Sequence, residues 1–179
     1  MQIVNGSILN AKEKIIVHQI NAVTTYARGL AQYIFEKYPY SNVYKERRTS
    51  EDCDSKKIAI IEDISDPGTI IIRTNSLNSA DPIIIGLVGQ HMPGRVGMTY
   101  FYKSIYGDME TNKMREEWFK SGLEHLKAYV EKNNVNAIAM PYNIGCGLAG
   151  GTWAVYSSML LNFEAETKCE VVLYKINDD

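Results

Sequence analysis

The sequence predicts an α/β domain of three layers, in which a mixed, mostly parallel sheet lies between helices. Two observations predict this fold class. Apolar, β-branched runs recur along the chain, and several are apolar at nearly every position, which is typical of strands covered on both faces. Helical stretches lie between these runs, and strands that alternate with helices favour an α/β architecture. The 179 residues suit one domain, 1–179.

The strands are predicted from consecutive aliphatic and β-branched residues. Seven runs carry this signal: Gln2–Val4, Ile15–Ile20, Ile58–Ile64, Thr69–Arg73, Pro82–Val88, Ala137–Met140 and Glu170–Ile176. Three stretches carry the helical period of 3.6 residues: Gly29–Tyr38, which Pro39 should end, Asn112–Asn133 and Thr152–Glu166. The charged segment Arg47–Lys57 is predicted to be an exposed loop. The aromatic and glycine-bearing segment 91–111 is predicted to fold over a surface as a lid.

Composition excludes or disfavours several classes of protein. Nineteen basic against twenty-one acidic residues give a formal charge of −2, which argues against a binder of duplex nucleic acid. No apolar run approaches the length of a membrane span, and the first residues lack the layout of a signal peptide. Cys53, Cys146 and Cys169 are too few and too widely spaced for a disulfide framework or a metal clip. We therefore expect an intracellular, cytoplasmic monomer with no metal, no cofactor and no membrane contact.

The most informative segment leaves the strand at Met140 and enters the helix near Trp153, with four glycines between them. A glycine-rich turn before a helix N-terminus can cradle a phosphate, because unpaired amides and the positive end of the helix dipole point the same way. The candidate ligand-binding residues are Asn143, Gly145, Cys146, Gly147, Leu148, Ala149 and Gly150. The alternative is a close-packed turn with no ligand. A dinucleotide-binding fingerprint is not supported, because no βαβ unit with a ribose-binding acid follows.

A second loop candidate follows the strand Ile15–Ile20, where polar residues lead into a helix that opens at Gly29. Ligands of open α/β sheets bind beyond the carboxyl ends of the strands, so two such loops would flank one crevice suited to a diphosphate. The candidate ligand-binding residues here are Asn21, Thr25, Tyr26, Arg28, Gly29 and Leu30.

Three segments together resemble the macrodomain family, which binds ADP-ribose. They read IVHQINAVTTYARGLAQYIFEKYPYSNVY, GLVGQHMPGR and MPYNIGCGLAGGTW, and the resemblance spans roughly residues 3 to 176. Within the family, the chain looks most like the ADP-ribose 1″-phosphate phosphatases and related single-domain viral and microbial macrodomains. The resemblance implies that the loops Thr24–Gly29 and Ile144–Gly151 hold the diphosphate. It also implies that Asn21 lies beside the distal ribose.

The resemblance further implies an adenosine side. Gln90 falls where a family strand ends near the adenosine, Tyr174 is placed to stack on the adenine, and Ser7 with Ile8 stands where the family often has Asp-Ile. A serine at that place is a weaker, neutral partner for the adenine amino group. The family hydrolases that remove terminal ADP-ribose from protein carry an Asp where this chain has Ala149, so that chemistry is not inferred.

Catalysis, if the chain is an enzyme, would depend on His18 and Asn21, which would position or activate water for hydrolysis of a phosphate or ester at the distal ribose. His18 has an equally good interpretation as a core histidine, and His91 is an alternative acid or base. A helix N-terminus would lower the pKa of the Cys146 thiol, although a packing role is favoured for it. Thr152 is either a ligand contact or a plain N-cap.

Two further functions compete with an enzyme. One is a non-catalytic reader of ADP-ribosylated protein, or a sponge for an ADP-ribose-derived nucleotide signal. The other is an interaction surface that has lost nucleotide binding, which the altered loop residues Ser7, Thr24 and Ala27 keep open.

Overall fold

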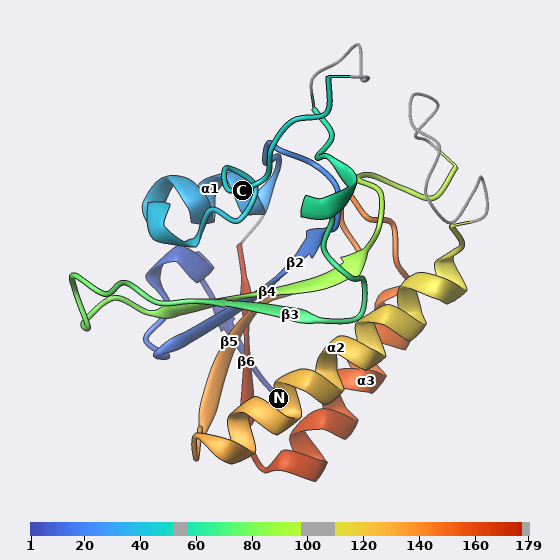
Figure 1. Ribbon diagram of the computed structural model, residues 1–179. Helices are drawn as coiled ribbons and strands as arrows, with labels where there is room; N and C mark the ends of the chain where they lie inside the picture. The colour runs from blue at the N-terminus through green and yellow to red at the C-terminus, as the bar shows by residue number, and fades with distance from the viewer. Residues whose placement is uncertain (52–56, 98–109, 177–179) are drawn as a thin grey trace.

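The computed structural model describes residues 1–51, 57–97 and 110–176, and its centre is a six-stranded sheet (Figure 1). The strands are β1 (Gln2–Asn5), β2 (Ile15–Asn21), β3 (Ile70–Arg73), β4 (Ile83–Gln90), β5 (Ala137–Pro141) and β6 (Glu170–Lys175), in the order β1-β6-β5-β2-β4-β3. All neighbours pair in parallel except β3, which is antiparallel to β4. The predicted mixed, mostly parallel sheet is confirmed.

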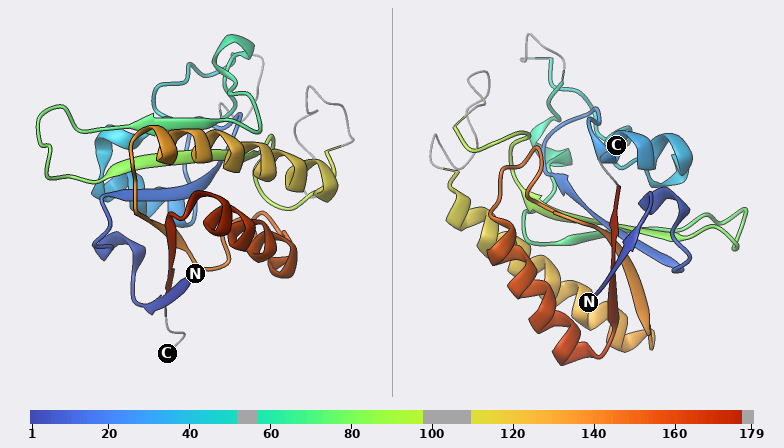
Figure 2. Two further views of the ribbon diagram at one scale, coloured as in Figure 1. Left: turned by 90° about the horizontal axis from the view of Figure 1, so that it is seen from below. Right: turned by 180° about the vertical axis from the view of Figure 1, so that it is seen from behind.

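Helices cover both faces of this sheet (Figures 1 and 2). Helices α2 (Asn112–Lys132) and α3 (Trp153–Thr167) lie against one face, and α1 (Leu30–Lys37) lies against the other. The short 3-10 turns η1 (Ile8–Asn10), η2 (Pro39–Ser41) and η3 (Ile61–Asp63) fill in around them. The three-layer α/β/α fold class is therefore confirmed. Among the described helices, none has the length and apolar character needed to cross a bilayer.

Two apolar cores hold the layers together, because successive residues of a buried strand point to opposite faces. On β2, Val17 packs into the core beneath α2 and α3, whereas Ile16 packs into the core beneath α1. Helix α2 contributes Leu126 to the first core, in which the rings of Phe119 and Tyr156 lie with centroids 4.6 Å apart. The continuous apolar runs of β2, β4 and β5 thus reflect strands that are covered on both faces.

The segment Ile58–Ile64, predicted to be a strand, is not one. It makes only two isolated bridges, Thr24 to Ile58 and Thr49 to Ala59, and then turns into η3. The turn forms because the carboxylate of Asp63 accepts hydrogen bonds from the backbone and guanidinium of Arg48. Ile61 is left exposed, so the apolar run buries too little surface to join the sheet. The aromatic residues of the predicted lid, at 100, 101, 102 and 106, and Cys53 lie outside the described residues.

We expect Leu126→Ala to lower the free energy of unfolding by about 2–5 kcal/mol, because it opens a cavity in a fully buried site between α2 and the sheet. Denaturant unfolding followed by circular dichroism measures this loss. Leu161→Ala is the matched control: this leucine lies on the exposed side of α3, and its change should cost about 0.5 kcal/mol or less. Equal losses in the two variants would contradict the assignment of the core.

Candidate functional site

Parallel strands bring two loops to the same edge of the sheet. Strand β2 pairs with both β4 and β5, so the first loop (residues 22–29, after β2) and the second loop (residues 142–152, after β5) leave the sheet side by side. The loops touch: a Cβ added to Gly29 would lie 2.8 Å from Cδ1 of Leu148, whose side chain is 66% exposed. The first loop leads into α1 and the second loop leads into α3.

Asn21 shapes the first loop from within. Its side-chain oxygen accepts hydrogen bonds from the amide of Val23 (3.1 Å) and from the amide and hydroxyl of Thr24 (2.8 and 3.0 Å). Its side-chain nitrogen donates to the hydroxyl of Tyr44 at 3.0 Å. This local turn is the usual role of an asparagine that ends a strand. Because the oxygen already accepts three hydrogen bonds, it is committed to the loop and not to a water molecule.

Arg47 fixes the backbone of the first loop by hydrogen bonds. Its guanidinium donates to the carbonyl oxygens of Thr24 (2.7 Å) and Asn21 (3.0 Å) and to the hydroxyl of Ser65 (3.0 Å). Arg47 is buried, which corrects the prediction that the whole segment Arg47–Lys57 is exposed.

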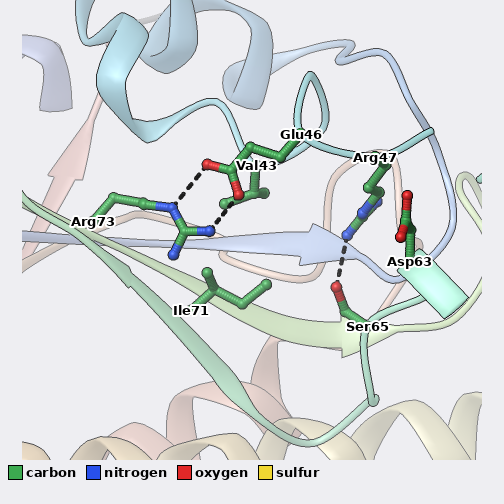
Figure 3. A pocket seen from close by; sticks show the side chains of 7 residues that line it. All are labelled: Val43, Glu46, Arg47, Asp63, Ser65, Ile71 and Arg73. Carbon is green, nitrogen blue, oxygen red and sulfur yellow. Dashed lines mark hydrogen bonds and ion pairs between the residues drawn. The ribbon is translucent and has the colours of Figure 1, made fainter.

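Arg47 also lines a cavity of about 200 Å³ beside β3 (Figure 3). The lining residues are Val43, Glu46, Arg47, Asp63, Ser65, Ile71 and Arg73. Glu46 is paired with Arg73, and Asp63 is paired with Arg48. The carboxylates of the cavity are therefore already neutralised by arginines of the protein.

Both helices that begin at this edge lack a side-chain cap. Helix α1 follows Gly29 and α3 follows Thr152, and neither residue caps its helix with a side chain. In contrast, Thr111 caps α2, the other described α-helix. Of the short 3-10 turns, η1 is capped by Ser7, whereas η2 and η3 have no side-chain cap. Among the residues that the structure describes, the amides of residues 28–30 and 147–149 donate to no acceptor. The edge thus presents two groups of free N–H donors on loops that touch.

The glycines of the second loop differ in whether a neighbouring side chain leaves room for a Cβ. Gly145 has φ +76°, and a Cβ at this residue would clash with the ring of Tyr156. Gly151 packs on the same ring, at 2.7 Å from a Cβ to Cε2. These two glycines fit the interpretation of a close-packed turn. Gly147 has no positive φ, and a Cβ there would meet nothing within 4 Å. No neighbour in the described protein requires a glycine at position 147.

Basic side chains flank the two loops. The guanidinium of Arg28 lies 5.3 Å from the ring centroid of Tyr26, and the ammonium of Lys57 lies at the same distance from that ring. On the other side, the aliphatic part of Arg95 packs against Gly150, with Cγ 2.7 Å from the position of an added Cβ. Basic residues therefore lie next to both loops.

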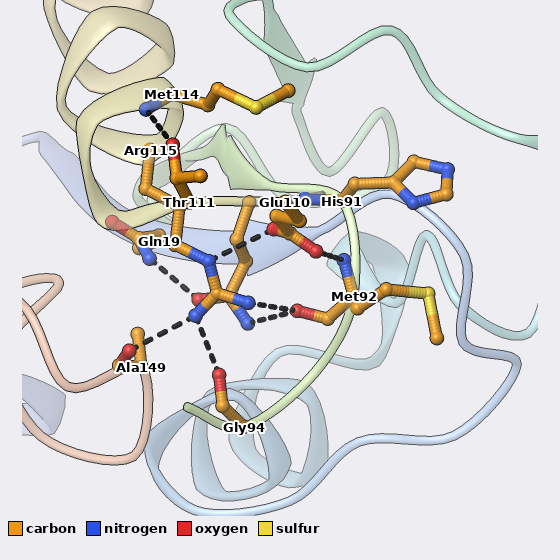
Figure 4. Close-up of polar contacts among 10 residues, drawn as sticks. Gln19, His91, Met92, Gly94, Glu110, Thr111, Met114, Arg115 and Ala149 are labelled. Atoms are coloured by element: carbon orange, nitrogen blue, oxygen red, sulfur yellow. Dashed lines mark hydrogen bonds and ion pairs between the residues drawn. The ribbon is translucent and has the colours of Figure 1, made fainter. Parts of the chain in front are cut away.

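A hydrogen-bonded chain lies beneath the loops (Figure 4). Gln19 donates to Gln90 at 2.8 Å, and Gln90 donates to the carbonyl of Met92 at 3.0 Å. That carbonyl also accepts from Arg115, which forms a buried ion pair with Glu110. Gln90, predicted near the adenosine, is thus buried among protein partners. Sequence reasoning missed Arg47, Glu110 and Arg115.

His18 is placed as a core residue. Its ring packs edge-on against Phe35, with centroids 5.5 Å apart, and it is 1% exposed. Burial lowers the pKa of His18 to about 4, so the ring is neutral at pH 7. His91 is also buried, and burial lowers its pKa as well. Of the two interpretations of His18, the surroundings favour the core histidine.

Several other predicted residues also have structural roles. Tyr174 is buried, and its hydroxyl donates to Glu13 and accepts from the amide of Lys12. The Ser7 hydroxyl caps η1, and Ile8 is buried. Burial raises the pKa of the Cys146 thiol to about 11, so the prediction that the helix N-terminus lowers this pKa is wrong and the packing role is favoured.

We expect the free energy of unfolding to fall as the pH drops from about 6.5 to about 4, because the unfolded chain then binds a proton that folded His18 does not accept. The full loss from this residue is about 3 kcal/mol. His18→Leu should reduce the slope in this window and leave the contribution of His91, as measured by urea unfolding at a series of pH values. His125→Gln, at an exposed position on α2, should keep the slope. An unchanged slope in His18→Leu would contradict the assignment.

Comparisons by sequence find no match, either among family models or among curated proteins. Solved structures do match. The macrodomain of Thermus aquaticus DarG has a TM-score of 0.66 at 16% identity, over 98% of this chain and 97% of that chain. Thermosipho africanus DarTG in complex with ADP-ribose has a TM-score of 0.65 at 15% identity, over 99% of this chain and 42% of that chain.

The Oceanobacillus iheyensis macrodomain with ADP has a TM-score of 0.60 at 18% identity, over 98% of this chain and 83% of that chain. All three matches run along essentially the whole of this chain. At these identities the likeness concerns the arrangement of the backbone. The chain has the macrodomain fold.

Proposed function

We propose that this protein binds ADP-ribose, or a molecule that ends in ADP-ribose, with the diphosphate lying against the amides of the first and second loops. The observation that carries the proposal is the contrast in capping. Helices α1 and α3 begin uncapped at the edge where the two loops touch, whereas α2, the other described α-helix, is capped by Thr111. Uncapped helix N-termini with free amides are suited to anions.

Three further observations support a diphosphate as the anion. Two separate groups of amides, one on each loop, match a ligand with two phosphates. Arg28 and Arg95 can supply positive charge from either side. Similar folds have been solved with ADP and with ADP-ribose bound.

The site supports binding better than hydrolysis. A general base must lie within hydrogen-bond reach of the water that it activates. His18 is packed in the core with a lowered pKa, and the side-chain oxygen of Asn21 is occupied by its own loop. The protein would therefore act as a reader of ADP-ribosylated protein or as a sponge for an ADP-ribose-derived nucleotide, working as a monomer.

Isothermal titration calorimetry with ADP-ribose, ADP and AMP tests the proposal. We expect a dissociation constant near 1 µM for ADP-ribose, about −8 kcal/mol, with weaker binding of ADP and much weaker binding of AMP. Equal affinity for AMP and ADP-ribose would show that the loops do not recognise the diphosphate. No heat at millimolar ligand would contradict nucleotide binding and leave only the fold.

Two glycine variants separate ligand binding from folding. Gly147→Ala should fold normally, since its Cβ would project into open space, but should weaken ADP-ribose binding by about tenfold, because the methyl group blocks close approach of the diphosphate. Gly145→Ala should instead lower the free energy of unfolding by about 1–3 kcal/mol, because it forces a Cβ into Tyr156. Calorimetry and thermal unfolding measure the two effects. Full affinity in Gly147→Ala would argue against ligand contact at the second loop.

A further inference from the structure

Arg115, in the first turn of α2, joins three separate segments of the chain (Figure 4). The side chain is 2% exposed. Its Nε donates to Glu110 at 2.8 Å, and its Nη2 donates to the carbonyl of Met92 at 3.1 Å. Its Nη1 donates to two further carbonyls, those of Gly94 (2.6 Å) and Ala149 (2.9 Å). One guanidinium therefore contacts the start of α2, the segment after β4 and the second loop.

Glu110 completes this clamp. One carboxylate oxygen of Glu110 accepts hydrogen bonds from Nε of Arg115 and from the amide of His91. The other oxygen accepts a hydrogen bond from the amide of Met92, and both amide bonds are 3.0 Å long. The carboxylate thus fixes the backbone directly after β4, and the guanidinium fixes the carbonyls that follow.

The clamp determines the shape of the second loop through one peptide group. The carbonyl of Ala149 accepts from Arg115, and the amide of Gly150, at the other side of the same peptide, donates to the carbonyl of Gly147 at 3.1 Å. A peptide bond is planar, so holding both of its sides fixes its orientation. The free amides of Leu148 and Ala149 lie inside the turn that this hydrogen bond closes.

Core packing alone does not call for an ion pair at this place. Two buried charges lose their hydration, and an apolar pair of similar volume is often equally stable or more so. What an apolar pair cannot do is bond to carbonyls of several segments at once, for which the planar guanidinium with its five donors is suited.

We propose that Arg115, held by Glu110, is a positioning residue that fixes the amides of residues 147–149 in the orientation that receives the diphosphate. Arg115 itself bonds to protein carbonyls and not to the ligand. This inference rests on the proposed function for its ligand, while its claim about the loop stands on the contacts above.

Arg115→Lys tests the inference, because lysine keeps the charge but cannot reach the carboxylate and three carbonyls together. We expect the ¹H–¹⁵N resonances of Gly147, Leu148 and Ala149 to shift or broaden in the free protein. ADP-ribose affinity should fall about tenfold, the size of one misaligned charge-assisted hydrogen bond, while AMP affinity changes less than about twofold. Glu110→Gln is the second variant, for which we expect the same changes in resonances and affinities. It tests the inference if Arg115→Lys does not fold.

Arg73→Lys is the matched control, since Arg73 lies on β3, away from the second loop, and pairs with the carboxylate of Glu46. It should leave the three resonances and both affinities unchanged. Unchanged loop resonances in Arg115→Lys and Glu110→Gln would overturn the inference, as would an equal loss of ADP-ribose and AMP affinity accompanied only by a lower melting temperature. If the loop resonances shift in the two variants but the wild-type protein does not bind ADP-ribose, the clamp is confirmed and the proposed function is contradicted.

Discussion

Backbone carbonyls at the carboxyl edge of the sheet need hydrogen-bond donors, and two buried arginines supply them. A backbone polar group that is shielded from water needs a hydrogen-bond partner within the protein. Arg47 donates to the carbonyls of Asn21 and Thr24 in the first loop. Arg115 donates to the carbonyl of Ala149 in the second loop. Both loops of the candidate site are thus held in place by hydrogen bonds from arginines to their backbone carbonyl oxygens.

This arrangement determines which backbone groups remain available to a ligand. Arginines occupy the carbonyl oxygens of Asn21, Thr24 and Ala149, whereas the amides of residues 28–30 and 147–149 donate to no protein acceptor in the described part of the chain. The uncapped starts of α1 and α3 add the positive ends of two helix dipoles. Free amides beside the starts of two uncapped helices favour an anion over a cation. The anion binding that we propose would therefore depend on how these two loops are held in place.

The sequence predicted the sheet, the helices and the position of both loops, because continuous apolar runs and glycines at strand ends are local signals. It did not predict the clamp, because Glu110 and Arg115 meet residues after β4 and Ala149 only in the folded chain. One local signal was present: Arg115 lies four residues before Phe119, on the apolar stripe of α2. Nor could spacing show that Gly145 is required by the ring of Tyr156 whereas Gly147 faces open space.

The same reasoning separates binding from catalysis. Donors that stabilise a diphosphate lower the free energy of the bound ligand, but they accelerate hydrolysis only if a group also activates water in the transition state. The strand that could carry such a group buries His18 against Phe35 of α1, where burial lowers the pKa of His18 to about 4. It ends at Asn21, whose oxygen completes a turn of the first loop. On this strand, the two side chains that could activate water are thus engaged in the packing and in the turn of the protein itself.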